Sequence, residues 1–184
     1  PSFPERAKIM PPVIASASPG SLRLDALYVF DIAQGRMEEA VFAIPAGVSV
    51  TQVRGEFIRD WRIEDEIPTP NSQLPTVGRT LRVVLNRPQT RQYALQIQAE
   101  RALAALPSEA ELPVIEPKGV IRASGHLALG TDSAIRLAIP QSGGLSQVDP
   151  KDFPRIILDK EHPRALPRAN AFYYLFAATP YQAK

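Results

Sequence analysis

The clearest pattern along the chain is an apolar side chain at every second position. It is strongest in two segments, whose alternating positions are Leu81, Val83 and Leu85 in the first and Tyr93, Leu95, Ile97 and Ala99 in the second. Successive side chains of a strand point to opposite faces, so this spacing predicts two half-buried strands. The short connection 86–91 predicts that they pair as an antiparallel hairpin.

Further segments carry the same kind of signal. The candidates are residues 27–32, 42–50 with a turn at 45–47, 61–63, 120–129, 134–139, 156–158 and 171–177. Prolines reinforce this interpretation, because 19 of the 184 residues are proline and they are spread along the whole chain. Each proline lacks a backbone donor and blocks the continuation of a helix. The pattern predicts an all-β fold, an antiparallel β-sandwich with very little helix.

The expected organisation is one β-rich module preceded by an arm. Residues 1–20 contain five prolines and are predicted to form an arm or linker, ordered against its own sheet or a neighbouring copy, and residues 21–184 form the module. Residues 41–53 and 136–148 align without gaps and share five identical positions. This leaves two interpretations open: duplicated halves at about 21–100 and 115–184, or chance recurrence of a strand, a proline turn and a strand.

Charge and composition narrow the classes of partner. The net charge is only +2, and acidic residues lie among the arginines between residues 54 and 101, which argues against nucleic-acid binding. The absence of cysteine excludes disulfides and thiolate metal sites. No apolar run approaches the roughly 20 residues of a membrane helix, so membrane insertion is not expected.

The sequence contains no recognisable catalytic motif. Glycine-rich phosphate-binding loops and the nucleophile elbow are missing. Two histidines, His126 and His162, have no third ligand at a suitable spacing. The acidic run Glu64, Asp65 and Glu66 is most simply a solvated turn, since neighbours on a strand face opposite ways. We therefore expect no catalytic residues, no metal, no cofactor and no enzymatic activity.

Aromatic residues supply the remaining candidates for a site. Phe172, Tyr174 and Phe176 share one strand face and are predicted to belong to the core. Exposed aromatics on a β-sandwich could instead stack against sugar rings. The candidate contacts with a ligand or partner are Trp61, Tyr173 and Tyr181.

Several stretches carry a resemblance to a class of bacterial module. They are Phe-Ala-Ile-Pro-Ala-Gly-Val at 42–48, Val-Arg-Gly at 53–55 and Arg-Asp-Trp-Arg-Ile-Glu-Asp at 59–65, followed by the strands at 81–85 and 93–101. In this order they resemble β-rich modules of very large, extracytoplasmic bacterial proteins of uncharacterised role. The resemblance implies a periplasmic or cell-surface location and brings no catalytic residues.

The function expected from the sequence is a non-catalytic interaction or scaffold module of a larger bacterial envelope or surface protein. Its partners would be protein, either neighbouring modules or copies of itself. The alternative is a carbohydrate-binding module that uses exposed aromatics.

Overall fold

The structure is a computed structural model that describes residues 6–9, 12–65, 78–105, 107, 109–131, 135–139, 142–154, 166, 169–178 and 181–183. The described chain is almost entirely strand and loop, and its one helical element is a 3-10 turn, η1, at Pro150–Asp152. The all-β prediction is confirmed. No helix in these ranges is long and apolar enough to cross a membrane.

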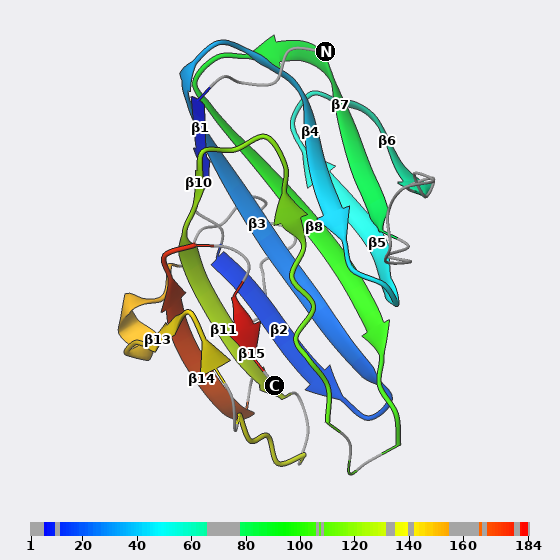
Figure 1. Cartoon of the computed structure of the whole chain (residues 1–184), viewed down its shortest axis with the longest axis vertical. Helices are drawn as coiled ribbons and strands as arrows, with labels where there is room; N and C mark the ends of the chain where they lie inside the picture. The colour runs from blue at the N-terminus through cyan, green and yellow to red at the C-terminus, as the bar shows by residue number, and fades with distance from the viewer. Residues whose placement is uncertain are drawn as a thin grey trace, which may run out of the picture.

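The strands fall into two main sheets and a short pair (Figure 1). The large sheet contains β1 (Arg6–Ile9), β2 (Pro12–Ser18), β3 (Ser21–Gln34), β5 (Val48–Gly55), β8 (Gln92–Ala102), β10 (Arg122–Ala123), β11 (Gly125–Thr131), β13 (Leu145–Gln147) and β14 (Ala169–Phe176). The small sheet contains β4 (Met37–Ile44), β6 (Ile58–Asp65), β7 (Arg79–Gln89) and β9 (Glu116–Pro117). The short pair is β12 (Ser142–Gly143) with β15 (Gln182–Ala183).

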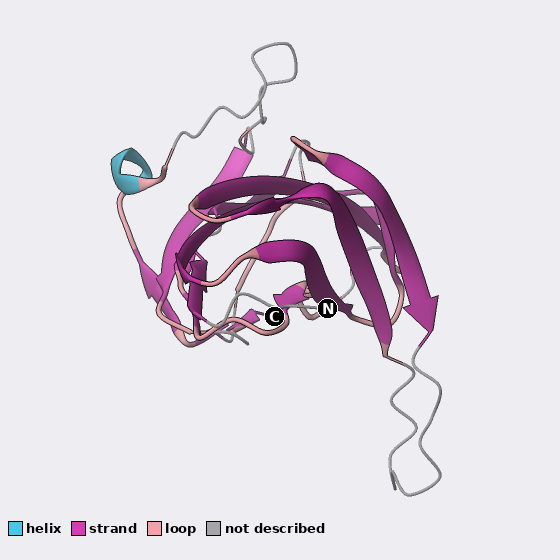
Figure 2. Ribbon diagram, turned by 90° about the horizontal axis from the view of Figure 1, so that it is seen from above, coloured by secondary structure: helices cyan, strands magenta, loops and turns pink. Residues whose placement is uncertain are grey.

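The large sheet is built around the long strand β3. From one edge to the other its strands run β13, β14, β11, β2, β3, β8 and β5. Past the end of β2, β1 occupies the same side of β3 and pairs in turn with β10. The pairs β2–β11 and β1–β10 are parallel and the others are antiparallel. Figure 2 shows that the long strands curve, so that this sheet wraps around the core.

The small sheet, in the order β6, β7, β4 and β9, arises because the chain repeatedly crosses between the layers. β3 and β8 pair along their length in the large sheet, and their continuations β4 and β7 pair in the small one. The crossing points lie together, since the Ile32 amide donates to the Arg91 carbonyl at 2.9 Å and Met37 pairs with Gln89. A single two-stranded ribbon therefore folds over and contributes to both layers.

This arrangement corrects the predicted hairpin. The six predicted core residues of β7 and β8 are all buried, at 6% exposure or less, as the alternation predicts. Within the described chain, however, β7 pairs with β4 and β6, whereas β8 pairs with β3 and β5. If β7 and β8 were paired in one sheet, their apolar faces would lie side by side. Because the two strands lie in separate sheets, these faces pack against each other across the core. The hairpin prediction is therefore wrong in its pairing and right in its buried face.

The core between the two layers contains a cluster of aromatic rings. The rings of Tyr28 and Phe42, from different sheets, have centroids 4.7 Å apart, and Phe30 approaches Phe42 at 6.2 Å. Phe30 also contacts Tyr93, with centroids 6.4 Å apart. These contacts join β3, β4 and β8 into one core.

The first 20 residues are not a separate linker in the part that the structure describes. β2 lies inside the large sheet between β3 and β11, and β1 pairs with the far end of β3. The expectation that this segment is ordered against its own sheet is confirmed for residues 6–9 and 12–18. Its buried residues, among them Ile14 at 4% and Ala15 at 0% exposure, make it part of the core.

The two similar sequences at 41–53 and 136–148 do not form the same element. The first comprises the end of β4, which pairs with β7 and β9, and β5, which pairs with β8. In the second, residues 135–139 are in no strand, β12 pairs with β15, and β13 pairs with β14. Because the strand neighbours differ, the sequence similarity does not mark a repeated strand–turn–strand unit.

Candidate interaction surfaces

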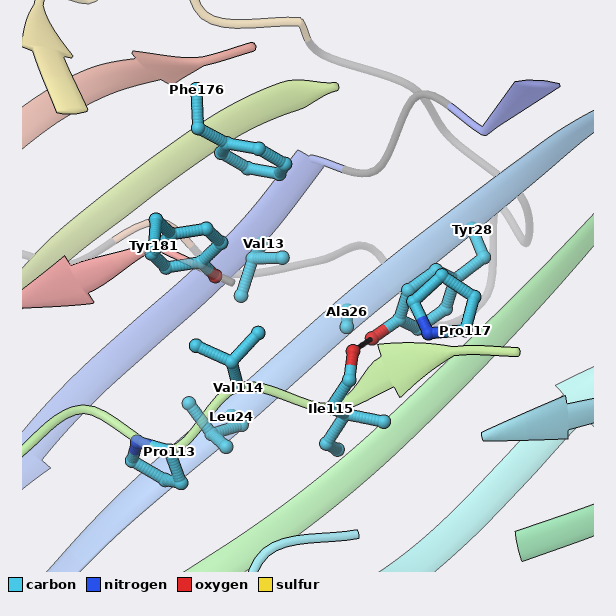
Figure 3. A pocket seen from close by; sticks show the side chains of 10 residues that line it. All are labelled: Val13, Leu24, Ala26, Tyr28, Pro113, Val114, Ile115, Pro117, Phe176 and Tyr181. Atoms are coloured by element: carbon cyan, nitrogen blue, oxygen red, sulfur yellow. Dashed lines mark hydrogen bonds between the residues drawn. The ribbon is translucent and has the colours of Figure 1, made fainter. Parts of the chain in front are cut away.

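An extended segment, which we call the strap (residues 112–117), crosses the inner face of the large sheet. At its start the Leu112 amide donates to the Ala183 carbonyl at 2.8 Å, and at its end β9 pairs with β4. In the middle, the Tyr28 hydroxyl donates to the Ile115 carbonyl at 2.7 Å (Figure 3). The strap therefore covers a part of the inner face that lies outside the small sheet.

The cavity beneath the strap is too small to hold a ligand. Figure 3 shows it lined by apolar residues of β2, β3, the strap and the C-terminal segment, with Phe176 and Tyr181 on one side. Its volume is about 10 Å³. A single water needs roughly 10–15 Å³ and several polar partners. We interpret this region as closely packed core between the strap and the large sheet.

A larger cavity lies next to the strap, where the turn between β2 and β3 approaches residues 109–112 and 135–139. Its volume is about 290 Å³. The walls are mostly apolar, with Leu22, Leu112 and Leu129 among them, and the charged residues that line it are Glu109 and Arg136. In size it reaches the lower end of small-molecule sites.

The three aromatic residues singled out from the sequence are not brought together. Tyr181 is 4% exposed and packs against Phe176, with ring centroids 4.5 Å apart, so it belongs to the core. Trp61 is half-buried on β6 of the small sheet and packs against the same core. Tyr173 is half-buried on β14 and belongs to a separate cluster with Phe153. A shared aromatic platform is therefore not formed by these residues.

A network of charges covers part of the outer face of the small sheet. Arg82 Nη1 donates to both carboxylate oxygens of Glu39, at 2.8 and 2.7 Å. Arg62 Nε donates to Glu64 at 2.6 Å, and this hydrogen bond lowers the pKa of Glu64. The bonds to Glu39 raise the pKa of Arg82. Since Glu64 is held between two guanidinium groups, it is a poor general acid or base.

Two further polar side chains, Asp25 and His126, lie on the outer face of the large sheet. Asp25 accepts hydrogen bonds from Gln96, at 3.0 and 2.9 Å, and from Gln98, at 3.2 Å. The His126 ring makes an edge contact with Phe153, at 6.2 Å between centroids. Burial lowers the pKa of His126, and the Asp152 charge opposes this effect. Asp25 and His126 therefore contribute to packing and hydrogen bonding within the fold.

The described residues hold no group of three or more His, Cys, Asp or Glu that could bind a metal ion. Of the residues weighed for catalysis, Glu64 is in the charge network and Asp65 ends β6, while His162 and Glu66 lie outside the described ranges. His126 is near Asp152 and the Phe153 ring, but among the described residues His126 and Asp152 are not joined by a third side chain that could complete a metal site.

The sheet edges differ in how they are protected. β6 carries five charged residues in eight, which discourages strand addition, and β13 has only three residues. β5 has eight residues, and Arg54 is its only charged residue. Within the described chain β5 pairs with β8 alone, and Ser49 and Thr51 are exposed. A bulge between Val50 and Gln52 interrupts an otherwise regular ladder.

The segments near the two ends of the chain that form β2 and β14 are not sheet edges in the strands that the structure describes there. β2 lies between β3 and β11, and β14 lies between β11 and β13. The sequence did not reveal that β5 is an edge strand. Which strands lie at an edge depends on pairing between segments that are distant in sequence. The low charge of β5 was nevertheless visible in Val-Ser-Val-Thr-Gln-Val at 48–53.

Comparison with known proteins gives a likeness in fold only. No protein-family model matches the sequence, and no curated protein matches it. The structure of native leukotriene A4 hydrolase from Saccharomyces cerevisiae matches 96% of this chain at 9% identity and a TM-score of 0.50, over 27% of that protein. The M1 zinc metallopeptidase from Deinococcus radiodurans matches 97% at 13% identity and a TM-score of 0.40, over 40% of that protein. The chain thus spans less than half of the length of either protein.

Proposed function

We propose that this chain is a non-catalytic interaction or scaffold module of a larger bacterial envelope or surface protein, and that it docks onto a strand of a neighbouring module through the edge of β5. The partner is protein, either another module or a second copy. The periplasmic or cell-surface location rests on the resemblance of residues 42–65 and the following strands to modules of large extracytoplasmic proteins.

The observation that carries the proposal is the edge of β5 beyond Val48, whose own amide and carbonyl are engaged by the Pro45 carbonyl and the Arg79 guanidinium. A free edge presents unpaired backbone donors and acceptors and pairs readily with another strand. Natural proteins usually block such edges with charges, as β6 does in this chain. β5 has one charged residue, and beyond the bulge at Thr51 its pairing with β8 is regular from Gln52 to Gly55. An edge of this kind is suited to receive a partner strand.

The fold is compatible with a module that belongs to a longer polypeptide. In leukotriene A4 hydrolase from Saccharomyces cerevisiae, the region that matches this chain makes up 27% of the protein. The described charged groups support a non-catalytic role, because Glu39, Glu64, Arg82 and Asp25 are engaged in contacts that hold strands together.

The experiment compares the native mass of the assembly recovered from the source cells for the wild type and for the Ser49→Lys/Thr51→Lys variant. Both side chains are exposed, so the fold should tolerate them while the edge becomes charged. Ala33→Lys/Gln34→Lys, at the exposed end of β3, is the matched control. We expect a wild-type assembly heavier than the single chain, lost in the β5 variant and kept in the control.

A wild-type chain recovered alone, or a β5 variant that assembles like the wild type, would contradict the proposal. Specific binding on a glycan array that Trp61→Ala abolishes would support the carbohydrate alternative instead.

A further inference from the structure

The cavity beside the strap has the properties of a small-molecule site. It lies at the end of the molecule where β2 turns into β3, and it is closed by residues that follow β8, by residues 109–112 and by residues 135–139. Its volume of about 290 Å³ contrasts with the 10 Å³ beneath the rest of the strap. The layer that covers the inner face is thus well packed along most of the strap and open at this end.

The wall of the cavity is apolar. Leu22, Leu112 and Leu129 are buried core residues, and Leu137 and Ile139 pack against the same core from the segment 135–139. Residues 135–139 alternate between half-buried and exposed positions, as a strand would, but are assigned to no strand. An apolar guest in this cavity would be shielded from water on several sides, which favours binding by about 25 cal/mol per Å² of surface buried.

Some of the polar residues at the rim already have partners within the protein. The Ser18 hydroxyl is 2.9 Å from the Ser21 hydroxyl, and Glu109 also interacts with another residue of the chain. The Arg136 side chain is exposed and makes no hydrogen bond or ion pair with the described part of the chain. A cation beside an apolar cavity is complementary to a molecule with an apolar body and an anionic head.

We propose that this cavity binds a small amphipathic anion, with its apolar part between Leu22, Leu129 and Leu137 and its carboxylate at Arg136. The volume of about 290 Å³ is close to the lower end of the roughly 300–1,000 Å³ of small-molecule sites, so the cavity suits a small ligand. A medium-chain carboxylate such as decanoate combines this small size with an apolar body and an anionic head. Arg136 serves as the positioning residue, because its planar guanidinium can donate two parallel hydrogen bonds to a carboxylate.

The test is calorimetric titration of the whole chain with sodium decanoate and, separately, with the uncharged decanol. Arg136→Gln should weaken decanoate binding by about tenfold, as expected for loss of a charge-assisted hydrogen bond, and leave decanol unchanged. Arg59→Gln, an exposed arginine on β6, is the control and should bind decanoate like the wild type.

Two cavity-filling variants test the location. Leu137→Trp and Ala110→Trp should each abolish binding of both compounds, and thermal unfolding identifies a variant that has lost its fold. Two variants are used because Leu137 packs against the core, whereas Ala110 lies outside any strand.

Three results would overturn the inference. They are no saturable binding of decanoate to the wild type, equal decanoate binding by Arg136→Gln, or unchanged binding by a folded cavity-filling variant. Binding of an extended uncharged peptide in place of decanoate would also overturn it, since the cavity would then accept a strand.

Discussion

At the scale of single residues, alternation in the sequence predicts burial well. Every second residue in 93–99 is buried, and Phe176 and Tyr174 belong to the core as their spacing suggests. Tyr181 is also buried, although the sequence made it a candidate for contact with a ligand or partner. The pattern could not reveal this, because Tyr181 is covered by Phe176 and by the strap, and the strap is distant from Tyr181 in sequence.

Gly55 is the residue whose size the structure limits most clearly. A Cβ placed there would lie 2.7 Å from the Tyr93 hydroxyl and 3.1 Å from the Ala94 carbonyl oxygen. The hydroxyl cannot move freely, since it donates to the Glu56 carbonyl at 2.8 Å. Gly55→Ala should therefore destabilise the fold by about 1–3 kcal/mol in urea unfolding, as overpacking does.

The matched control is Gly143→Ala, where the added Cβ would meet Gln182 at an ordinary 3.7 Å. Its free energy of unfolding should change by less than about 0.5 kcal/mol. Equal stabilities of the two variants would contradict the packing described at Gly55.

His126 should contribute to the pH dependence of stability. Burial lowers its pKa in the folded state, so the unfolded chain binds a proton more readily at this residue. The resulting stability is present above the unfolded pKa of about 6.5 and is lost as the pH falls through the lower folded value. His126→Asn should flatten the fall in unfolding free energy between pH 7 and pH 5; an unchanged slope would count against the burial of this ring.

At the scale of elements, the strands themselves were predictable and their pairing was not. The long segments at 81–85 and 93–99 are strands, but they belong to different sheets. A period of two identifies the buried face, and a short connection only suggests that neighbours pair. The partner of β8 is β3, more than 60 residues earlier, through eleven paired positions that no local signal records.

Cysteine cross-linking distinguishes the two pairings directly, since the chain has no cysteine of its own. Val29 and Ala94 are cross-strand partners on β3 and β8, and both are half-buried. The Val29→Cys/Ala94→Cys variant should be joined efficiently by oxidation or a short bis-thiol reagent, because paired Cβ atoms lie about 4.5–5.5 Å apart.

The comparison variant is Val84→Cys/Ala94→Cys, which places the thiols on β7 and β8. These strands lie in different sheets, so this variant should remain unlinked under the same conditions. Preferential linking of positions 84 and 94 would restore the hairpin and contradict the sheet topology.

At the scale of the whole molecule, the two proposals concern two places. The edge of β5 is the proposed docking site for a partner strand, and the cavity at the open end of the strap, beside Arg136, is the proposed ligand site. Neither place could be located from the sequence, because each is created by strands and loops that meet only in the folded chain. What the sequence did indicate was the lack of charge in 48–53 and the absence of catalytic motifs.

The most direct measurement of the central claim is site-specific photo-crosslinking in the source cells, with a photoreactive amino acid at Thr51 of β5 or, as a control, at the exposed Gln92 of β8. A partner strand added to the β5 edge would lie within reach of residue 51. The account predicts a covalent adduct to one protein partner from position 51, mapped by mass spectrometry to an extended segment, and none from position 92. No adduct from position 51, or the same adducts from both positions, would contradict it.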